Sequence, residues 1–125
     1  MFFPYRLDQQ YRLMLAPFRL DGDDGVTISD DTFRATFGWK TVEVPMTNVV
    51  EAHATHEYQW FKAIGMRLSF ADDGLTFGTS THGGVCVHFA ERIPKVIGLR
   101  DHSALTVTVD DLDALVTAIN DRVGA

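Results

Sequence analysis

The sequence has a single cysteine, no excess of basic residues and no long hydrophobic run. One thiol, Cys86, excludes a disulfide within the chain and favours a reducing compartment. The formal net charge is −6, which argues against nucleic acid and anionic membranes as partners, because both attract basic proteins. No apolar stretch is long enough to span a membrane, and the N-terminal MFFPYRLDQQYR is too polar for a signal peptide. We therefore expect a cytoplasmic protein.

What the sequence does contain is enough apolar material for a core. Of its 125 residues, 46% are hydrophobic and nine are Phe. A chain of this size folds without disulfides or metal ions, usually as one domain. We expect a lead-in over residues 1–24 that packs on a single domain of residues 25–125. In the lead-in, Asp8 is placed to cap a short helix that Pro17 ends, and a strand through residues 11–15 is the alternative.

The C-terminal residues predict a strand followed by a helix. Apolar and Thr residues alternate over 105–109, the period of a half-buried strand. The spacing then becomes helical, with Asp110 as the expected N-cap and Gly124 just beyond the end. The helix has one apolar stripe, formed by Leu112, Leu115, Val116, Ile119 and Val123. Such a stripe covers an open end or face of the preceding body.

The body between the lead-in and this helix reads as a meander of short strands. Gly and Asp turns separate segments of alternating polarity, which indicates an all-antiparallel sheet, curled or paired so that one face is dry. The predicted strands are 26–29, 32–37, 41–46, 49–56, 66–70, 75–79, 85–89 and 105–109. In the third of these, Pro45 belongs on a sheet edge or at a bend. In the fourth, Val50, Ala52 and Ala54 are expected to point inward.

Three segments resemble small bacterial pleckstrin-homology-like domains of an uncharacterised actinobacterial type: GVTISDDTFRATFGWKTVEVPMTNV, GMRLSFADDGLTFGTSTHGGVCVHF and LTVTVDDLDALVTAI. The resemblance implies a partial β-barrel or roll of seven or eight antiparallel strands, with the C-terminal helix plugging one end. It implies no activity, because this fold serves many unrelated partners. Phosphoinositide-binding members carry a basic cluster at the first hairpin turn. Here that turn is Asp30-Asp31, so we expect no phosphoinositide binding.

Two pairs of side chains have spacings that chemistry uses. His53 and His56 are three apart, but on a strand such residues point to opposite faces, which is wrong for a shared metal ion. Cys86 and His88 share one strand face, and a thiol beside an imidazole is the pair that cysteine nucleophiles use. The sequence identifies no orienting third group and no oxyanion hole. We expect no metal, no cofactor and no catalytic residue.

Two irregular segments are candidates for partner contact. The aromatic segment EYQWFKAIG over residues 57–65 either presents its rings to a partner or packs them over the barrel end. The connector over 92–103 mixes bases with aliphatics and either forms a contact surface or folds onto the body. The candidate contact residues are Trp60, Phe61, Lys62, Ile97, Leu99 and Arg100.

These observations favour a non-catalytic module that binds a protein or itself through a strand edge or the surface near the helix. One alternative is a binder of a small apolar ligand in the Phe-rich barrel interior. Another is a small enzyme that uses Cys86 and His88.

Overall fold

The computed structural model describes residues 1–20, 23–56, 65–68, 74–80, 82–94, 96 and 101–124. Its strands form a four-stranded sheet of order β1-β2-β3-β4 and a five-stranded sheet of order β5-β8-β9-β7-β6. The first sheet contains β1 (Phe2–Pro4), β2 (Gly25–Ile28), β3 (Thr32–Phe37) and β4 (Lys40–Pro45). The second contains β5 (Val49–His56), β6 (Gly65–Leu68), β7 (Leu75–Gly78), β8 (Gly83–Ile93) and β9 (His102–Val107).

The described residues also form helices. The N-terminal helical segment consists of η1 (Gln9–Tyr11), α1 (Arg12–Leu15) and η2 (Ala16–Phe18), and η3 (Met46–Asn48) joins β4 to β5. The C-terminal helix α3 is Leu112–Val123. Within the described residues, no helix combines the length and the apolar character that crossing a membrane requires.

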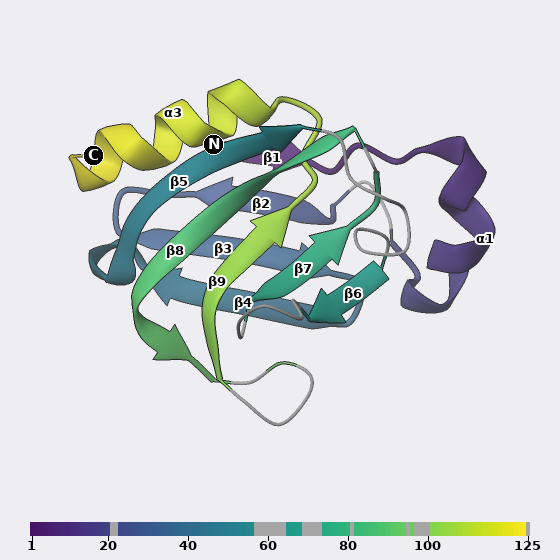
Figure 1. The fold of residues 1–125 in the computed structure, drawn as a ribbon, viewed down its shortest axis with the longest axis horizontal. Helices are drawn as coiled ribbons and strands as arrows, with labels where there is room; N and C mark the ends of the chain where they lie inside the picture. The colour runs from purple at the N-terminus through teal and green to yellow at the C-terminus, as the bar shows by residue number, and fades with distance from the viewer. Residues whose placement is uncertain are drawn as a thin grey trace.

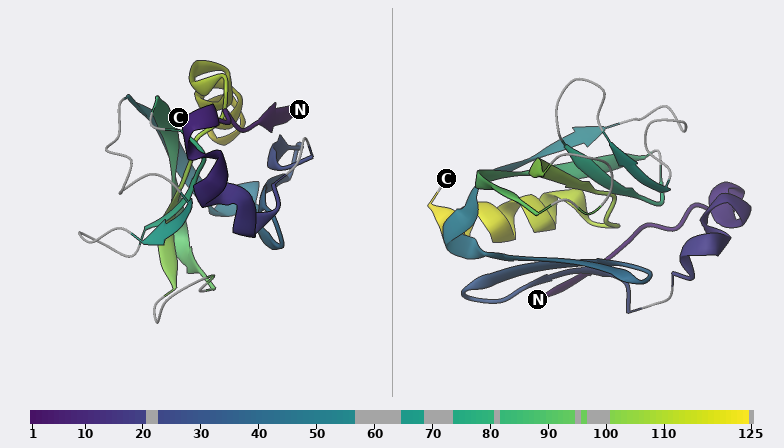
Figure 2. Two further views of the ribbon diagram at one scale, coloured as in Figure 1. Left: turned by 90° about the vertical axis from the view of Figure 1, so that its right-hand side faces the viewer. Right: turned by 90° about the horizontal axis from the view of Figure 1, so that it is seen from below.

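The two sheets form separate layers, and α3 lies between them along one side (Figures 1 and 2). The alternation read from the sequence explains this arrangement, because each strand turns its apolar residues toward the space between the layers. The largest fully buried side chains of this core include Phe33, Phe37, Phe77, Leu105, Leu115 and Ile119. The apolar stripe of α3 covers this core, as the sequence predicted.

All eight predicted strands are present, but the predicted barrel and the all-antiparallel sheet are wrong. The sheets stay open and stack as two layers. β7 and β9 pair in parallel, with Leu75 opposite Leu105 and Phe77 opposite Val107. A parallel pair joins strands that are distant in sequence, so alternation within each strand carries no information about it.

In the lead-in, the structure has the predicted short helix, and the alternative strand through residues 11–15 is not formed. Phe2–Pro4 forms a ninth strand, β1, antiparallel to β2, which the sequence analysis missed. Residues 9–18 are helical, but Pro17 lies inside the last 3-10 turn instead of ending the helix before it. The Asp8 carboxylate accepts a hydrogen bond from Ser80 Oγ at 2.8 Å, and the Asp8 carbonyl accepts one from the Tyr11 N–H at 3.1 Å.

Strand β5 departs from the prediction at its start. Ala52 is buried as expected, but Val50 is 50% exposed and Val49 is buried in its place. The reason is a β-bulge: Val49 pairs with Phe89, and Glu51 already pairs with the next residue of β8, His88. One extra residue in β5 therefore turns Val50 out of the core.

Helix α3 begins one residue later than predicted. The N-cap is Asp111 instead of Asp110, and its carboxylate accepts from the Ala114 N–H at 3.1 Å. Its C-cap is Gly124, at a φ of +75°. The side chain of Asn120 binds both backbone groups of Ala52, accepting at 2.9 Å and donating at 3.0 Å. This pairing covers the outer edge of β5 and connects the helix to the sheet.

Candidate functional sites

The six contact residues predicted from the sequence all lie outside the described residues: Trp60, Phe61, Lys62, Ile97, Leu99 and Arg100. Their role stays a prediction. The described residues present two other candidate sites. One is a cluster of His and Cys side chains on the five-stranded sheet, and the other is an apolar surface around the N-terminal helical segment.

Three potential metal ligands converge on the outer face of the five-stranded sheet: His53 of β5, and Cys86 and His88 of β8. His53 stands directly opposite Cys86 in the strand register, and His88 follows on the same face of β8. Val85 and Val87, which alternate with Cys86 and His88 along β8, are buried in the core. Alternation along β8 therefore directs Cys86 and His88 outward, which confirms that the two share a face.

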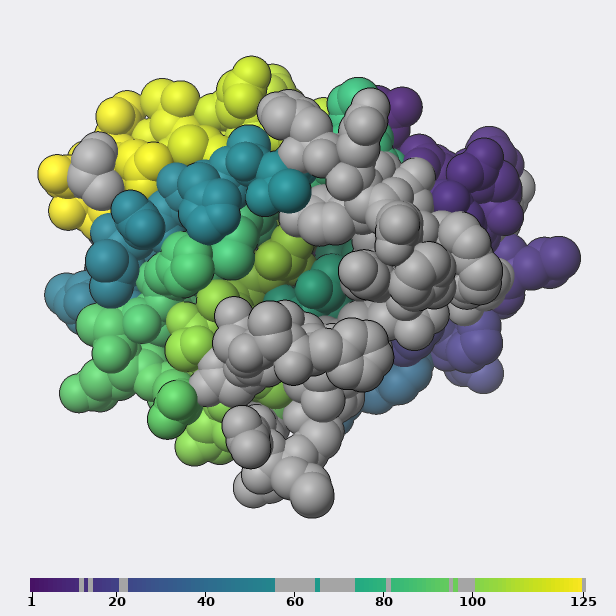
Figure 3. All heavy atoms as spheres, viewed as in Figure 1, coloured from purple at the N-terminus to yellow at the C-terminus, as the bar shows by residue number. Residues whose placement is uncertain are grey.

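The three side chains are close to one another. Sγ of Cys86 lies 3.6 Å from Nε2 of His88. The rings of His53 and His88 stack, with centroids 5.2 Å apart and planes inclined by 25°. One ligand atom from each residue lies within 4.8 Å of the other two. His53 is exposed and the other two are half-buried, and β5 and β8 reach the surface side by side (Figure 3). A small ion or reagent can reach the cluster.

Two members of this cluster, Cys86 and His88, were predictable from the sequence, and the third was not. In the sequence, His53 has a ligand-like spacing only with His56, whose side chain is outside the described part of the chain. The signal that joins His53 to Cys86 is the register between β5 and β8, which are separated by about 30 residues of sequence. No local pattern specifies that register.

The surface around the N-terminal helical segment is rich in exposed apolar side chains. Leu13 of α1 is 91% exposed, Trp39 of the β3–β4 turn is 62% exposed and Leu7 is 52% exposed. Large exposed apolar groups that lie together are typical of binding surfaces. We call this surface, together with the cavity described next, the apolar end. It lies beyond one end of the sheets, around the α1 label in Figure 1.

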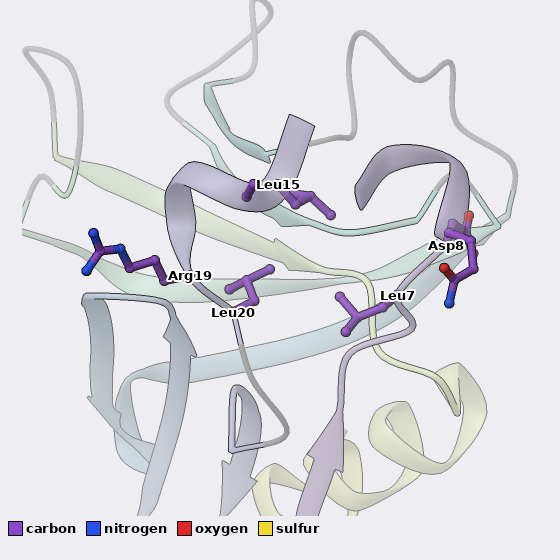
Figure 4. Close-up of a pocket in the computed structure, with 7 residues that line it drawn as sticks. Leu7, Asp8, Leu15, Arg19 and Leu20 are labelled. Carbon is purple, nitrogen blue, oxygen red and sulfur yellow. The ribbon is translucent and has the colours of Figure 1, made fainter. Parts of the chain in front are cut away.

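A cavity of about 390 Å³ opens at the apolar end. Leu7, Leu15 and Leu20 turn their side chains toward one another in it, whereas the guanidinium of Arg19 extends away (Figure 4). The volume falls in the lower part of the range for small-molecule sites. The lining would accept an apolar group.

The helical segment is held against the body by aromatic packing. The ring of Phe18 stacks on Trp39 at 5.5 Å and meets the edge of Phe37 at 5.0 Å. Gly38, which lies between Phe37 and Trp39 in the sequence, has a φ of +61°. A Cβ there would overlap the carbonyl oxygen of Phe18. The Asp24 carboxylate accepts from the Gly38 N–H at 3.1 Å. The turn and the helical segment therefore fix each other's position.

Buried polar groups anchor the chain just before this segment. The buried Thr79 donates from its hydroxyl to the Arg6 carbonyl at 2.5 Å and lies 2.9 Å from the Thr108 hydroxyl. The Tyr5 hydroxyl donates to the Thr36 carbonyl at 2.6 Å. Burial, with a smaller contribution from the charge of Asp24, raises the pKa of Tyr5 well above its ordinary value.

The free sheet edges expected to suit peptide addition are partly closed. Asn120 occupies the edge of β5 at Ala52. One of the two edge strands of the first sheet is β4, which ends in Pro45, as predicted for an edge position. Proline has no N–H to offer an added strand.

No family model matches the sequence, and no characterised protein or solved structure is significantly similar to it.

Proposed function

We propose that the protein is a non-catalytic interaction module that pairs with a second copy of itself through the apolar end. The observation that carries the proposal is Leu13, 91% exposed, on the same segment as an apolar cavity. A knob and a hole on one surface are self-complementary under a two-fold axis. In such a dimer, Leu13 of each copy fills the cavity of the other.

The energetics favour a weak dimer. Burying one leucine side chain contributes about 1.5–3 kcal/mol, and the two-fold arrangement buries two of them together with part of each Trp39. Association costs about 4–15 kcal/mol in lost translational and rotational freedom. The gain from burial is therefore close to the lower end of this cost, so we expect a weak dimer whose fraction rises with protein concentration.

The test is sedimentation velocity from micromolar to millimolar concentration. We expect a monomer–dimer equilibrium that Leu13→Asp abolishes, because a carboxylate cannot enter the cavity without losing its hydration. Ala16→Leu, which adds bulk to the cavity lining, should abolish it as well. The matched control is Val50→Asp, since Val50 is also an exposed apolar residue but belongs to β5.

A wild-type protein that stays monomeric throughout would refute self-association. The alternative function is then the binding of a small apolar ligand, which the cavity lined by three leucines favours. In that case a fluorescent apolar probe should bind the wild-type monomer and not Ala16→Leu. Dissociation by Leu13→Asp alone, with Ala16→Leu still dimeric, would show that the cavity is not the acceptor.

We also propose that the protein has a pleckstrin-homology-like fold and a cytoplasmic location. A first sheet in meander order and a C-terminal helix on the core support a pleckstrin-homology-like relationship, whereas the parallel pair β7–β9 departs from it. The single thiol, which forms no disulfide within the chain, supports a cytoplasmic location.

A further inference from the structure

The cluster of His53, Cys86 and His88 has the donor set of a transition-metal site. Imidazole nitrogen and thiolate sulfur are the ligands that Zn²⁺ and its neighbours in the first transition row prefer, whereas Ca²⁺ and Mg²⁺ prefer oxygen. From this donor set and its geometry, we propose that these three residues bind one Zn²⁺ ion on the outer face of β5 and β8. Three protein ligands leave the fourth tetrahedral position open to water or another ligand.

The distances suit such an ion. With Zn–S near 2.3 Å and Zn–N near 2.0–2.1 Å, a tetrahedral site places its sulfur and nitrogen ligands about 3.5 Å apart. The observed separation of Cys86 Sγ from His88 Nε2 is 3.6 Å. The distance between the ligand atoms of Cys86 and His88 therefore already matches that of a tetrahedral zinc site.

The third ligand has the freedom to complete the site. All three ligand atoms lie within 4.8 Å of one another, so each remaining distance must shorten by at most about 1.5 Å for tetrahedral Zn²⁺. The rings of His53 and His88 are now nearly parallel, and one must tilt before both nitrogens point at one ion. His53 is exposed, so its ring can rotate without displacing packed neighbours.

The surroundings favour a cation at this position. Glu51 pairs with His88 across the two strands and is exposed on the same face as His53. Its carboxylate adds negative charge beside the site and can accept a hydrogen bond from a ligating imidazole, as acidic groups commonly do around zinc. This site departs from the expectation of no metal drawn from the sequence, where His53 had been weighed only with His56.

A simpler interpretation of the same geometry is a thiol–imidazole hydrogen bond beside two stacked rings. It makes a different prediction, because a hydrogen bond leaves the thiol protonated and open to reagents. Zinc requires the thiolate and occupies its lone pair. The protonation and reactivity of the Cys86 sulfur therefore distinguish the two interpretations. Because Cys86 is the only cysteine in the chain, a thiol-specific signal reports on it alone.

The experiment is a titration of the purified, metal-stripped full chain with Co²⁺, followed by displacement with Zn²⁺. We expect one Co²⁺ per chain, a thiolate-to-cobalt charge-transfer band in the near ultraviolet and the intense visible absorption of a tetrahedral ion. Zn²⁺ should abolish both signals and slow the reaction of Cys86 with a thiol-specific reagent. The binding of metal should release the thiol proton.

The variants assign each ligand. Cys86→Ser should remove the charge-transfer band, and His53→Ala should weaken Co²⁺ binding by more than about 100-fold, beyond the loss typical of an outer partner. The exposed His82, in the turn before β8, provides the matched control, since His82→Ala should leave the affinity unchanged. Because His53 is exposed, its replacement preserves the fold, which the unfolding midpoint checks.

Three results would overturn the proposal. The first is tetrahedral absorption without a thiolate band, and the second is an affinity that His53→Ala and His82→Ala change equally. The third is a thiol whose reactivity Zn²⁺ does not alter, which would support the hydrogen-bonded interpretation instead. None of these results depends on whether the protein dimerises, so the metal site and the proposed function fail independently.

Discussion

Replacing Gly38 with alanine tests how closely the N-terminal helical segment packs on the body. Gly38 begins the turn between β3 and β4 at a φ of +61°, where a Cβ would overlap the carbonyl oxygen of Phe18. The turn cannot simply swing away, because the Gly38 N–H is bound to the Asp24 carboxylate. Gly38→Ala therefore forces the chain around Phe18 to move.

The expected loss of stability has two parts. A side chain at positive φ costs about 1–2 kcal/mol. Displacing Phe18 then weakens its ring contacts with Trp39 and Phe37, each of which contributes about 0.5–1.5 kcal/mol. We expect Gly38→Ala to lower the free energy of unfolding by about 2–4 kcal/mol, taking these contributions together.

A matched substitution at Gly124 distinguishes the cost of the positive φ from the loss of ring contacts. It has a similar φ, +75°, but a Cβ there would meet nothing within 4 Å. Gly124→Ala should therefore cost only the conformational part, about 1–2 kcal/mol. Urea unfolding followed by tryptophan fluorescence measures both variants, and Trp39 reports directly on the displaced ring. Equal losses for the two variants would refute the close packing of Phe18 on the turn.

Two further predictions concern buried groups. Asn120→Ala leaves the N–H and C=O of Ala52 without the Asn120 side chain as their partner. Urea unfolding should show that the variant loses about 2 kcal/mol of unfolding free energy. An unchanged stability would mean that water replaces the amide fully. Tyr5 has a raised pKa in the folded state, so above about pH 10 the unfolded state loses the phenol proton while the folded state keeps it. The stability contribution of Tyr5 is thus complete below pH 10 and declines above it, and Tyr5→Phe should reduce the alkaline slope of the unfolding free energy. An identical slope in Tyr5→Phe would contradict the burial of the phenol, whatever the variant loses with the Thr36 hydrogen bond.

The strands were predictable because their signal is local. Alternation places Phe33, Ala35 and Phe37 on one face of β3 whatever the strand pairs with, and all three are buried. β1 was missed because three residues, FFP, are too few to show a period. The parallel pairing of β7 with β9 was missed because pairing depends on contacts between distant segments, which the period of a single strand does not encode.

In the candidate sites, too, features set by local spacing were predictable, and features set by contacts between distant segments were not. That Cys86 and His88 share a face was predictable from their spacing, and the structure confirms it. That His53 joins them was not, because it depends on the register between two strands. The apolar end was equally inaccessible, since the exposure of Leu13 depends on how the helical segment sits on the turn around Trp39.

One extra residue in β5 determines both the core and the metal-ligand cluster. Strict alternation that begins with the buried Val49 would turn Glu51 and His53 inward, and it would turn Ala52 outward. The bulge lets Val49 and Ala52 both be buried, three positions apart, and directs His53 outward opposite Cys86. The exposed Val50 is the structural consequence of this arrangement. The face on which His53 lies is therefore set by the bulge, which ties the proposed metal site to the packing of the sheet.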